Sequence, residues 1–482
     1  MSIVENLEPK LLWKRFEEIS SIPRCSKHED KIRQYLIDFA KQKGLRSKTD
    51  KSGNVVVIKP ASAGMENKPT VVLQSHMDMV CEKNSDVDHD FDKDPIKLKR
   101  DGDILTAEGT TLGADDGIGV ATTLAILEDN ELKHGPIEGL FTVDEETGLT
   151  GAFALEKHML TGKIMLNIDS EDFGVITVGC AGGGESKITL PVKKQSVDKN
   201  LLHLQIKILG LRGGHSGVDI HEQRGNAIKI LTRILWKASK KYSFLLSDIK
   251  GGDKHNAIPR ESMATVFIKK DEKNAFVSDL KKETKNILDE IKPIDPGLKV
   301  DLKDIESVDY ALDKESQLRL LNLIHGLPNG VHQMNYEIAG LVDTSTNLAT
   351  LKIEKDNALV GLSSRSSIGS ALQDMRDRIH AIADLSGAKV EEDTPYPGWK
   401  PNLDSNLLKK SKQIFKEMYG KEPIIEAIHA GLECGIIGEK FPGMEMISVG
   451  PTIKYPHSPE EQVHISTVEK FFDYVIKILQ GV

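Results

Sequence analysis

Short apolar segments alternate with helical patterns over the first third of the chain. Apolar residues recur at helical spacing from Leu7 to Lys43, which predicts two helices separated by a loop. Runs rich in β-branched or apolar residues at 55–58 and 71–79 are bounded by turn residues and predict strands. Two further strands of buried type are expected at 137–143 and 164–168. This alternation indicates an α/β fold.

The pattern changes after residue 184. Segments with strict alternation, such as 202–208, are interleaved with amphipathic helical patterns near 224–240, 275–291 and 367–385. Alternation predicts a sheet with one exposed face, hence an antiparallel sheet covered by helices on its other side. We therefore expect an inserted α+β domain over 186–390.

A proline-rich stretch at 391–399 leads into a second helical and strand-like region. A chain of 482 residues exceeds what one hydrophobic core usually serves. We expect the first domain to resume here, so that 1–185 and 391–482 together surround the insertion.

Composition excludes several classes of protein. Charged residues make up 28% and hydrophobic ones 39%, which argues against disorder and against a membrane protein. A net charge of -9 disfavours nucleic-acid binding. The N-terminus shows no signal-peptide pattern. No C-x-x-C spacing occurs, which argues against a disulfide framework and a thiolate zinc site, so we expect a cytoplasmic, reduced protein. The four cysteines are Cys25, Cys81, Cys180 and Cys434.

Acidic residues stand repeatedly just past the C-terminal ends of the predicted strands. The stretch at 71–79 ends in His76 and Asp78, and side chains two apart in an extended segment point to the same side. In open α/β sheets this edge is where sites are built. The residues gathered there are His76, Asp78, Asp115, Asp116, Glu145, Glu146, Asp169 and His457.

Two histidines with several carboxylates and no cysteine suit a hydrolytic site for zinc or a similar divalent ion, with room for two ions bridged by a carboxylate. Acidic helix caps and turns would explain any one of these residues, but not readily the whole set. Two other readings are weaker. The alternating aspartates at 86–94 lack the glycine and glutamate of a calcium loop, and the Gly-x-Gly pieces near 113–119 place two aspartates where phosphate would be repelled.

Six short motifs follow one another along the chain. They are Ser-His-Met-Asp-Met-Val-Cys at 75–81, Gly-Ala-Asp-Asp-Gly at 113–117, Val-Asp-Glu-Glu-Thr-Gly at 143–148, Asn-Ile-Asp-Ser at 167–170, Gly-Gly-His-Ser-Gly at 213–217 and Tyr-Pro-His at 455–457. In this order they resemble the motifs of the co-catalytic zinc metallopeptidases, the family that includes glutamate carboxypeptidase and aminoacylase. The long insertion and the stretches 221–226 and 255–260 narrow the resemblance to the cytosolic dipeptidases of this family.

The resemblance implies an α/β catalytic domain with a mixed sheet flanked by helices, interrupted by an inserted α+β lid domain with an antiparallel sheet. It implies two divalent metal ions, with zinc expected first and cobalt or manganese as alternatives. Asp115 would bridge the two ions, Asp78 would orient His76, and Glu145 would be the general base. A cis peptide between Asp115 and Asp116 is also implied. The implied metal ligands are His76, Asp115, Glu146, Asp169 and His457.

The resemblance further implies a substrate-binding group in the inserted domain. His215 would stabilise the developing charge on the substrate carbonyl, while Asn256, Arg365 and the backbone at Gly431 would hold the C-terminal end of the substrate. A guanidinium can grip a carboxylate with two hydrogen bonds, although Arg365 could also be a surface residue. The implied protein is a homodimer that hydrolyses unblocked dipeptides, including Xaa-His dipeptides. An aminoacylase, a carboxypeptidase or a peptide-binding protein without catalysis are the alternatives.

Overall fold

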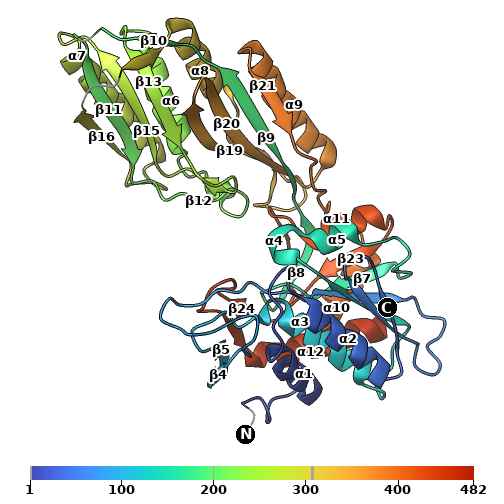
Figure 1. Cartoon of the computed structure of the whole chain (residues 1–482). Helices are drawn as coiled ribbons and strands as arrows, with labels where there is room; N and C mark the ends of the chain where they lie inside the picture. Colours follow the sequence, from blue (N-terminus) through green and yellow to red (C-terminus); the bar gives the residue numbers. More distant parts are fainter. Residues whose placement is uncertain (1–2, 199, 306–308) are drawn as a thin grey trace. The chain divides into compact units, whose positions relative to one another are not determined.

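The computed structural model describes residues 3–198, 200–305 and 309–482, which form two compact units (Figure 1). The first unit comprises Met1–Cys180, Trp399–Ala427 and Leu432–Val482. The second comprises Ala181–Gly398 and the short segment Ile428–Gly431. The change of unit at 180/181 precedes the expected boundary at 185/186, because a single ten-residue strand starts at Gly182. The return to the first unit comes at Trp399 rather than at 391, since the backbone of Tyr396 still pairs with Gly183.

The first unit is built on an eight-stranded mixed sheet with the order β1-β2-β6-β3-β7-β23-β8-β22. Strands β3, β6, β7 and β23 run parallel, whereas β1 and β2 are antiparallel additions at one side. The predicted mixed sheet is confirmed. The strands are β1 Arg46–Thr49, β2 Val55–Lys59, β3 Val71–His76, β6 Ile137–Thr142, β7 Ile164–Asn167, β8 Val175–Cys180, β22 Ile424–Ile428 and β23 Glu445–Ser448.

Helices flank this sheet, as expected. Every residue of β3 and β6 is buried, which explains why these strands are apolar without alternation. Helix α3 is apolar on almost all sides and is buried from Asp116 to Leu127. The helices of the unit are α1 Lys10–Ser20, α2 Asp30–Gln42, α3 Ala114–Glu128, α4 Glu145–Gly148, α5 Thr150–Ala154, α10 Asn406–Tyr419, α11 Glu433–Lys440 and α12 Ile465–Gly481.

A smaller four-stranded sheet in the first unit has the order β24-β25-β5-β4. It joins residues from both parts of the unit, because β25 pairs with β5. The loop between β24 and β25 carries His457. The strands are β4 Leu98–Asp101, β5 Ile104–Ala107, β24 Ile453–Lys454 and β25 Gln462–His464.

The second unit holds a nine-stranded antiparallel sheet with the order β16-β11-β15-β13-β19-β20-β9-β21, and β18 pairs with β19. Burial alternates along β9 and β11, so one face is covered, and the helices lie behind the sheet in Figure 1. The predicted antiparallel sheet with a helical layer is confirmed. The strands are β9 Gly182–Pro191, β11 Leu202–Leu209, β13 Leu245–Gly251, β15 Ser262–Ile268, β16 Lys299–Asp304, β18 Gly330–Met334, β19 Val342–Glu354, β20 Asn357–Ser366 and β21 Lys389–Glu392.

The helical layer and four short strands complete the second unit. Strand β10 pairs with β17, and β12 pairs with β14. None of the helices within the described segments combines the length and apolar character needed to cross a bilayer. The elements are α6 Ala227–Ala238, α7 Lys273–Ile291, α8 Lys314–Gly326, α9 Gly369–Leu385, the 3₁₀ turn η1 Ile220–Glu222, and the strands β10 Lys194–Ser196, β12 Gly214–His215, β14 Ala257–Ile258 and β17 Tyr310–Leu312.

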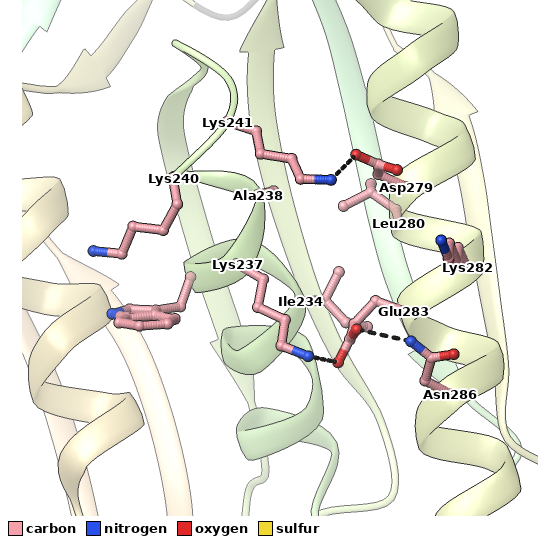
Figure 2. A pocket seen from close by; sticks show the side chains of 11 residues that line it. Ile234, Lys237, Ala238, Lys240, Lys241, Asp279, Leu280, Lys282, Glu283 and Asn286 are labelled. Carbon is pink, nitrogen blue, oxygen red and sulfur yellow. Dashed lines mark hydrogen bonds and ion pairs between the residues drawn. The ribbon is translucent and has the colours of Figure 1, made fainter.

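A surface groove of about 300 Å³ lies between α6 and α7 (Figure 2). Both of its carboxylates are paired with lysines. The Lys241 ammonium contacts Asp279 at 2.9 Å, and Glu283 accepts from both Lys237 and Asn286. This groove contains none of the residues singled out from the sequence, and its paired charges give it no evident chemistry.

Candidate metal centre

The candidate ligands lie where adjacent strands of the first unit end. Strand β3 ends at His76, β6 leads into the short helix that contains Glu146, and β7 is followed by Asp169. Because β3 runs parallel to both β6 and β7, these three ends share one edge of the sheet. Asp115 comes from the start of α3. The sheet edge expected from the sequence is therefore where the polar residues gather.

The two oxygens of Asp115 contact two different histidines. Oδ1 of Asp115 lies 3.1 Å from Nε2 of His76, and Oδ2 lies 3.1 Å from Nε2 of His457. Each histidine nitrogen also meets a second carboxylate, Asp169 at 3.3 Å for His76 and Glu146 at 2.9 Å for His457. The five residues thus form two clusters. One contains His76 and Asp169, the other contains His457 and Glu146, and Asp115 belongs to both.

The electrostatics of these clusters favour a bound cation. Burial raises the pKa of Asp169 to about 6, in spite of the nearby His76. Hydrogen bonds to Asp115 and Glu146 raise the pKa of His457 to about 11. Such shifts mean that the clusters hold protons to offset their crowded negative charge, a role that a divalent cation also fills. Oε1 of Glu146 is buried without a hydrogen-bond partner in the described chain. The donor set therefore fits divalent metal ions.

Asp78 is occupied by donors from the protein. Its Oδ1 lies 3.4 Å from Nδ1 of His76 and accepts the backbone N–H of Glu145, while Oδ2 accepts from Ser26 and from the backbone of Glu146. Asp78 therefore contacts Nδ1 of His76, while Asp115 contacts Nε2, the other nitrogen of the same ring. The contact between Asp78 and His76 is a close ion-pair contact between buried groups, whereas the hydrogen bonds to Asp78 come from Ser26 and the backbone of Glu145 and Glu146.

Glu145 and Glu146 open the four-residue helix α4. Strand β6 ends at Thr142, and Asp144, with a left-handed φ of 50°, precedes this helix directly. Neighbouring residues on a helix point about 100° apart. Glu146 contacts His457. Burial raises the pKa of Glu145 well above its usual value, and the charge of His76 offsets this only in part.

Asp116 has a structural task that the sequence did not reveal. Its carboxylate accepts the backbone N–H of His76 at 3.2 Å and that of Gly119 at 3.1 Å. It thereby ties the end of β3 to the first turn of α3. The peptide bond between Asp115 and Asp116 is cis, so the implied isomer is confirmed.

His215 in the second unit has a defined tautomer. Its Nδ1 accepts the backbone N–H groups of Gly217 and Val218 at 3.2 and 3.0 Å. Burial and the positive charge of Arg365 lower the pKa of His215. A neutral ring whose Nδ1 accepts must carry its proton on Nε2, so His215 presents a hydrogen-bond donor there.

Strand pairing brings Asn256 next to His215. Strand β12 contains His215 and pairs with β14, which begins directly after Asn256. The carbonyl of Asn256 accepts the backbone N–H of Ser216 at 2.8 Å. The side chain of Asn256 is exposed. Two residues separated by 41 positions in the sequence therefore share one loop cluster.

Arg365 lies on β20 and is only 8% exposed, so it is not a surface arginine. Its Nη1 donates to the hydroxyl of Tyr396 at 2.9 Å, whereas its buried Nε has no hydrogen-bond partner among the described residues. Gly431 packs against the Tyr396 ring, because a Cβ at Gly431 would lie 3.0 Å from Cε2. Arg365, Tyr396 and Gly431 therefore form one group within the second unit.

Two members of this environment were missed from the sequence. Tyr396 stands in the proline-rich stretch, which was interpreted only as a connection. His429 contacts Ser345 through Nε2 at 2.7 Å, and burial together with the charge of Arg365 lowers its pKa to about 3. No sequence pattern near either residue indicates its role. Tyr396 meets β20 and His429 meets β19 only because later segments of the chain fold back onto these strands.

The expectation that all cysteines are reduced is wrong for one pair. Cys25 and Cys81 form a disulfide, with Cα atoms 5.7 Å apart and a separation of 56 positions in the sequence. Spacing could not reveal this pair, because the N-terminal loop pairs with the segment after β3 only in the fold. The bridge flanks Ser26 and Asp78. Cys180 and Cys434 are free and buried.

The sequence and the fold identify the family. Residues 72–481 match peptidase family M20/M25/M40, and the chain belongs to this family. It is 39% identical to the cytosol non-specific dipeptidase of Escherichia coli (strain K12), over 100% of this chain and 99% of that protein. The predicted peptidase family is confirmed, and hydrolysis is its reaction class.

Solved structures agree with this assignment. The aminoacylhistidine dipeptidase from Vibrio alginolyticus superposes with a TM-score of 0.95 at 41% identity and covers 100% of this chain and 98% of that chain. The aminopeptidase PepT from Bacillus cereus ATCC 10987 has a TM-score of 0.56 at 18% identity, over 98% of this chain and 99% of that chain, and supports the fold alone. The narrower resemblance to the dipeptidases of the family is confirmed.

Proposed function

We propose that this member of peptidase family M20/M25/M40 hydrolyses the peptide bond of unblocked dipeptides, including Xaa-His dipeptides, with two divalent metal ions. One observation carries the proposal: the two carboxylate oxygens of Asp115 contact two different imidazoles, one in each cluster. The relatives at 39% and 41% identity, which each match 100% of this chain, are named as dipeptidases, one non-specific and one for aminoacyl-histidine.

The residues of the two clusters suit zinc, because imidazole and carboxylate ligands without thiolate are common in hydrolytic zinc sites. His76 and Asp169 would hold one ion, Glu146 and His457 the other, and Asp115 both. Cobalt or manganese would fit the same donors. When bound, such ions lower the pKa of a water molecule and polarise the substrate carbonyl.

Glu145 is the proposed general base. A base must accept a proton from water and return it to the leaving amine, so its pKa should lie near the working pH. Burial raises the pKa of Glu145 in that direction. Asp78 does not take part in this transfer, because its oxygens are held by His76, Ser26 and backbone N–H groups. It keeps Nε2 of His76 turned toward Asp115.

The second unit supplies the proposed substrate contacts. The Nε2–H of His215 is a donor for the negative charge that develops on the carbonyl oxygen, an interaction that counts most in the transition state. The guanidinium of Arg365 would bind the substrate carboxylate, and its unpaired Nε is available for this. Asn256 and the backbone at Gly431 complete the proposed set.

A substrate panel on metal-stripped and metal-restored protein tests the proposal. We expect the restored enzyme to cleave Xaa-His and other free dipeptides, and to leave N-acetyl amino acids and tripeptides largely intact. Cleavage of the acylated compounds alone would assign an aminoacylase. Binding of dipeptides without turnover in metal-restored protein would assign a peptide-binding protein.

Assembly and cellular location are parts of the same proposal. We expect a homodimer, measurable by light scattering. The E. coli relative is named a cytosol enzyme, and a cytoplasmic location is proposed here also. The Cys25–Cys81 bridge offers a check, since trapping thiols in intact cells and mapping them by mass spectrometry shows whether this pair is oxidised where the protein works.

A further inference from the structure

Glu461 makes an unusual set of contacts. Its side chain is 2% exposed, and its carboxylate accepts four consecutive backbone N–H groups. Oε2 accepts from Leu112 and Gly113 at 2.7 and 2.8 Å, and Oε1 accepts from Ala114 and Asp115 at 2.7 and 3.2 Å. One carboxylate thus fixes the whole backbone turn that ends in the shared metal ligand.

Glu461 belongs to the same loop as His457. The two residues are four positions apart between β24 and β25, and the bond from Glu461 to Asp115 spans 346 positions. The side chains of His457 and Asp115 meet at 3.1 Å. The His457 loop and the Asp115 turn are therefore connected twice. One connection is the contact between the His457 and Asp115 side chains, and the other is the set of hydrogen bonds from the turn's backbone to Glu461.

Arg24 closes this arrangement on the other side of the same turn. Its buried guanidinium donates to the carbonyl of Gly113 and, at 2.7 Å, to the carbonyl of Asp78. The peptide groups of Gly113 are thus held by Glu461 at the N–H and by Arg24 at the carbonyl. Gly113 has φ of 67°, and a Cβ there would lie 2.6 Å from Nη2 of Arg24, so only glycine fits.

We propose that Glu461 is a positioning residue of the metal centre. It holds the Asp115 turn and the His457 loop in a fixed relative position, so that each oxygen of Asp115 faces one cluster. This inference rests on the proposed function. The hydrogen bonds described for Glu461 come from backbone N–H groups and not from a candidate ligand side chain. Its effect would act through the backbone of Asp115, as outer partners of metal ligands do.

The test is metal affinity measured without turnover. Metal-stripped wild-type protein should bind two equivalents of Zn²⁺ in competition with a chromophoric chelator. Glu461→Gln replaces one acceptor by an amide donor that opposes the N–H groups of the turn. We expect the weaker of the two Zn²⁺ affinities to fall by roughly 10 to 100-fold, the usual effect of losing such a partner. Excess Zn²⁺ should restore part of the dipeptidase activity.

Two controls separate positioning from simple helix stabilisation. Asp103→Asn removes a carboxylate that caps α12 through Ser466 and should lower thermal stability while leaving both Zn²⁺ affinities unchanged. Glu460→Gln alters the exposed neighbour of Glu461 and should change neither property. If Glu461→Gln does not fold, Glu461→Asp retains the charge with a shorter reach, and its weaker Zn²⁺ affinity should fall by a smaller factor.

The outcomes distinguish this inference from the proposed function. If the wild type does not bind two equivalents, the dinuclear site itself is wrong. Suppose instead that the wild type binds two equivalents of Zn²⁺ and that folded Glu461→Gln binds both with unchanged affinity. That result overturns the positioning role, and the same result with Glu461→Asp does so if Glu461→Gln does not fold. A loss of affinity no larger than that of Asp103→Asn would overturn it equally.

Discussion

The polar groups of the two units have opposite chemical character. In the first unit, carboxylates crowd around His76 and His457, and the site collects negative charge. In the second, Arg365 lies near His215 and His429 and lowers the pKa of both rings. The first arrangement attracts cations, while the second offers donors to anions. The proposed division of labour, with metal binding in the first unit and recognition of the substrate's charged groups in the second, rests on this difference in charge.

The two groups also differ in how the fold assembles them. Parallel strands bring the acidic residues to one sheet edge, so neighbouring strands deliver neighbouring ligands. In the second unit, Arg365 lies on a long antiparallel strand, His215 on a two-residue strand, and Gly431 on a four-residue segment that returns from far along the chain. Substitutions should therefore separate metal binding from substrate recognition.

Replacing Glu145 by Gln should have the largest effect. Loss of a general base typically lowers the rate by about 10² to 10⁴-fold. We expect kcat to fall in this range, with both metal equivalents still bound, as measured by dipeptide hydrolysis and metal analysis. Glu131→Gln, at an exposed position of the same unit, should behave as the wild type. Full turnover by Glu145→Gln would require a different base.

Replacing Arg365 by Met should impair recognition and leave the metals in place. The guanidinium is buried, and loss of a charged partner at a binding site commonly costs about 2 to 5 kcal/mol. We expect most of the loss in KM for free dipeptides, with unchanged metal content. The matched substitution Tyr396→Phe removes one contact to Arg365 and should have a smaller effect in the same direction. A drop in metal content in Arg365→Met would contradict the proposed division between metal binding in the first unit and substrate recognition in the second.

Removing the disulfide should affect stability more than chemistry. The double variant Cys25→Ser, Cys81→Ser opens a loop of 56 positions, and a bridge across a loop of this length stabilises a protein by about 2 to 4 kcal/mol. We expect a lower unfolding midpoint in urea, with metal stoichiometry retained at 25 °C. The single variant Cys180→Ser is the control for thiol removal, since Cys180 is free. An unchanged midpoint for the double variant would show that the bridge does not stabilise the fold.

The smallest expected effect concerns acid sensitivity of the second unit. The pKa of His429 is about 3 in the folded protein, against about 6.5 for an unperturbed histidine. The unfolded chain therefore binds more protons between these values, and stability falls by up to about 1.4 kcal/mol per pH unit as the pH drops below 6.5. In His429→Gln, hydrogen exchange of β19 peptides should depend less on pH between 7 and 5. An equal dependence in both proteins would exclude His429 as the cause.

The sequence predicted the parts of this molecule that depend on local pattern. Residues at strand ends, such as His76 and Asp169, could be found because parallel strands end at a shared edge. Cys25 with Cys81, Tyr396 with Arg365, and Glu461 with the Asp115 turn could not, since only the return of distant segments brings them together. The short helix at Glu145 was likewise missed, because four residues are too few for a helical periodicity to be visible in the sequence.

The central claim is that two metal ions share Asp115, and anomalous diffraction from crystals of the zinc-loaded protein tests it directly. We predict two zinc peaks, each about 2.0 to 2.2 Å from an oxygen of Asp115, one also bound to His76 and the other to His457. Asp78 should lie outside bonding distance of both. A single zinc, or a zinc bound to Asp78, would contradict the account.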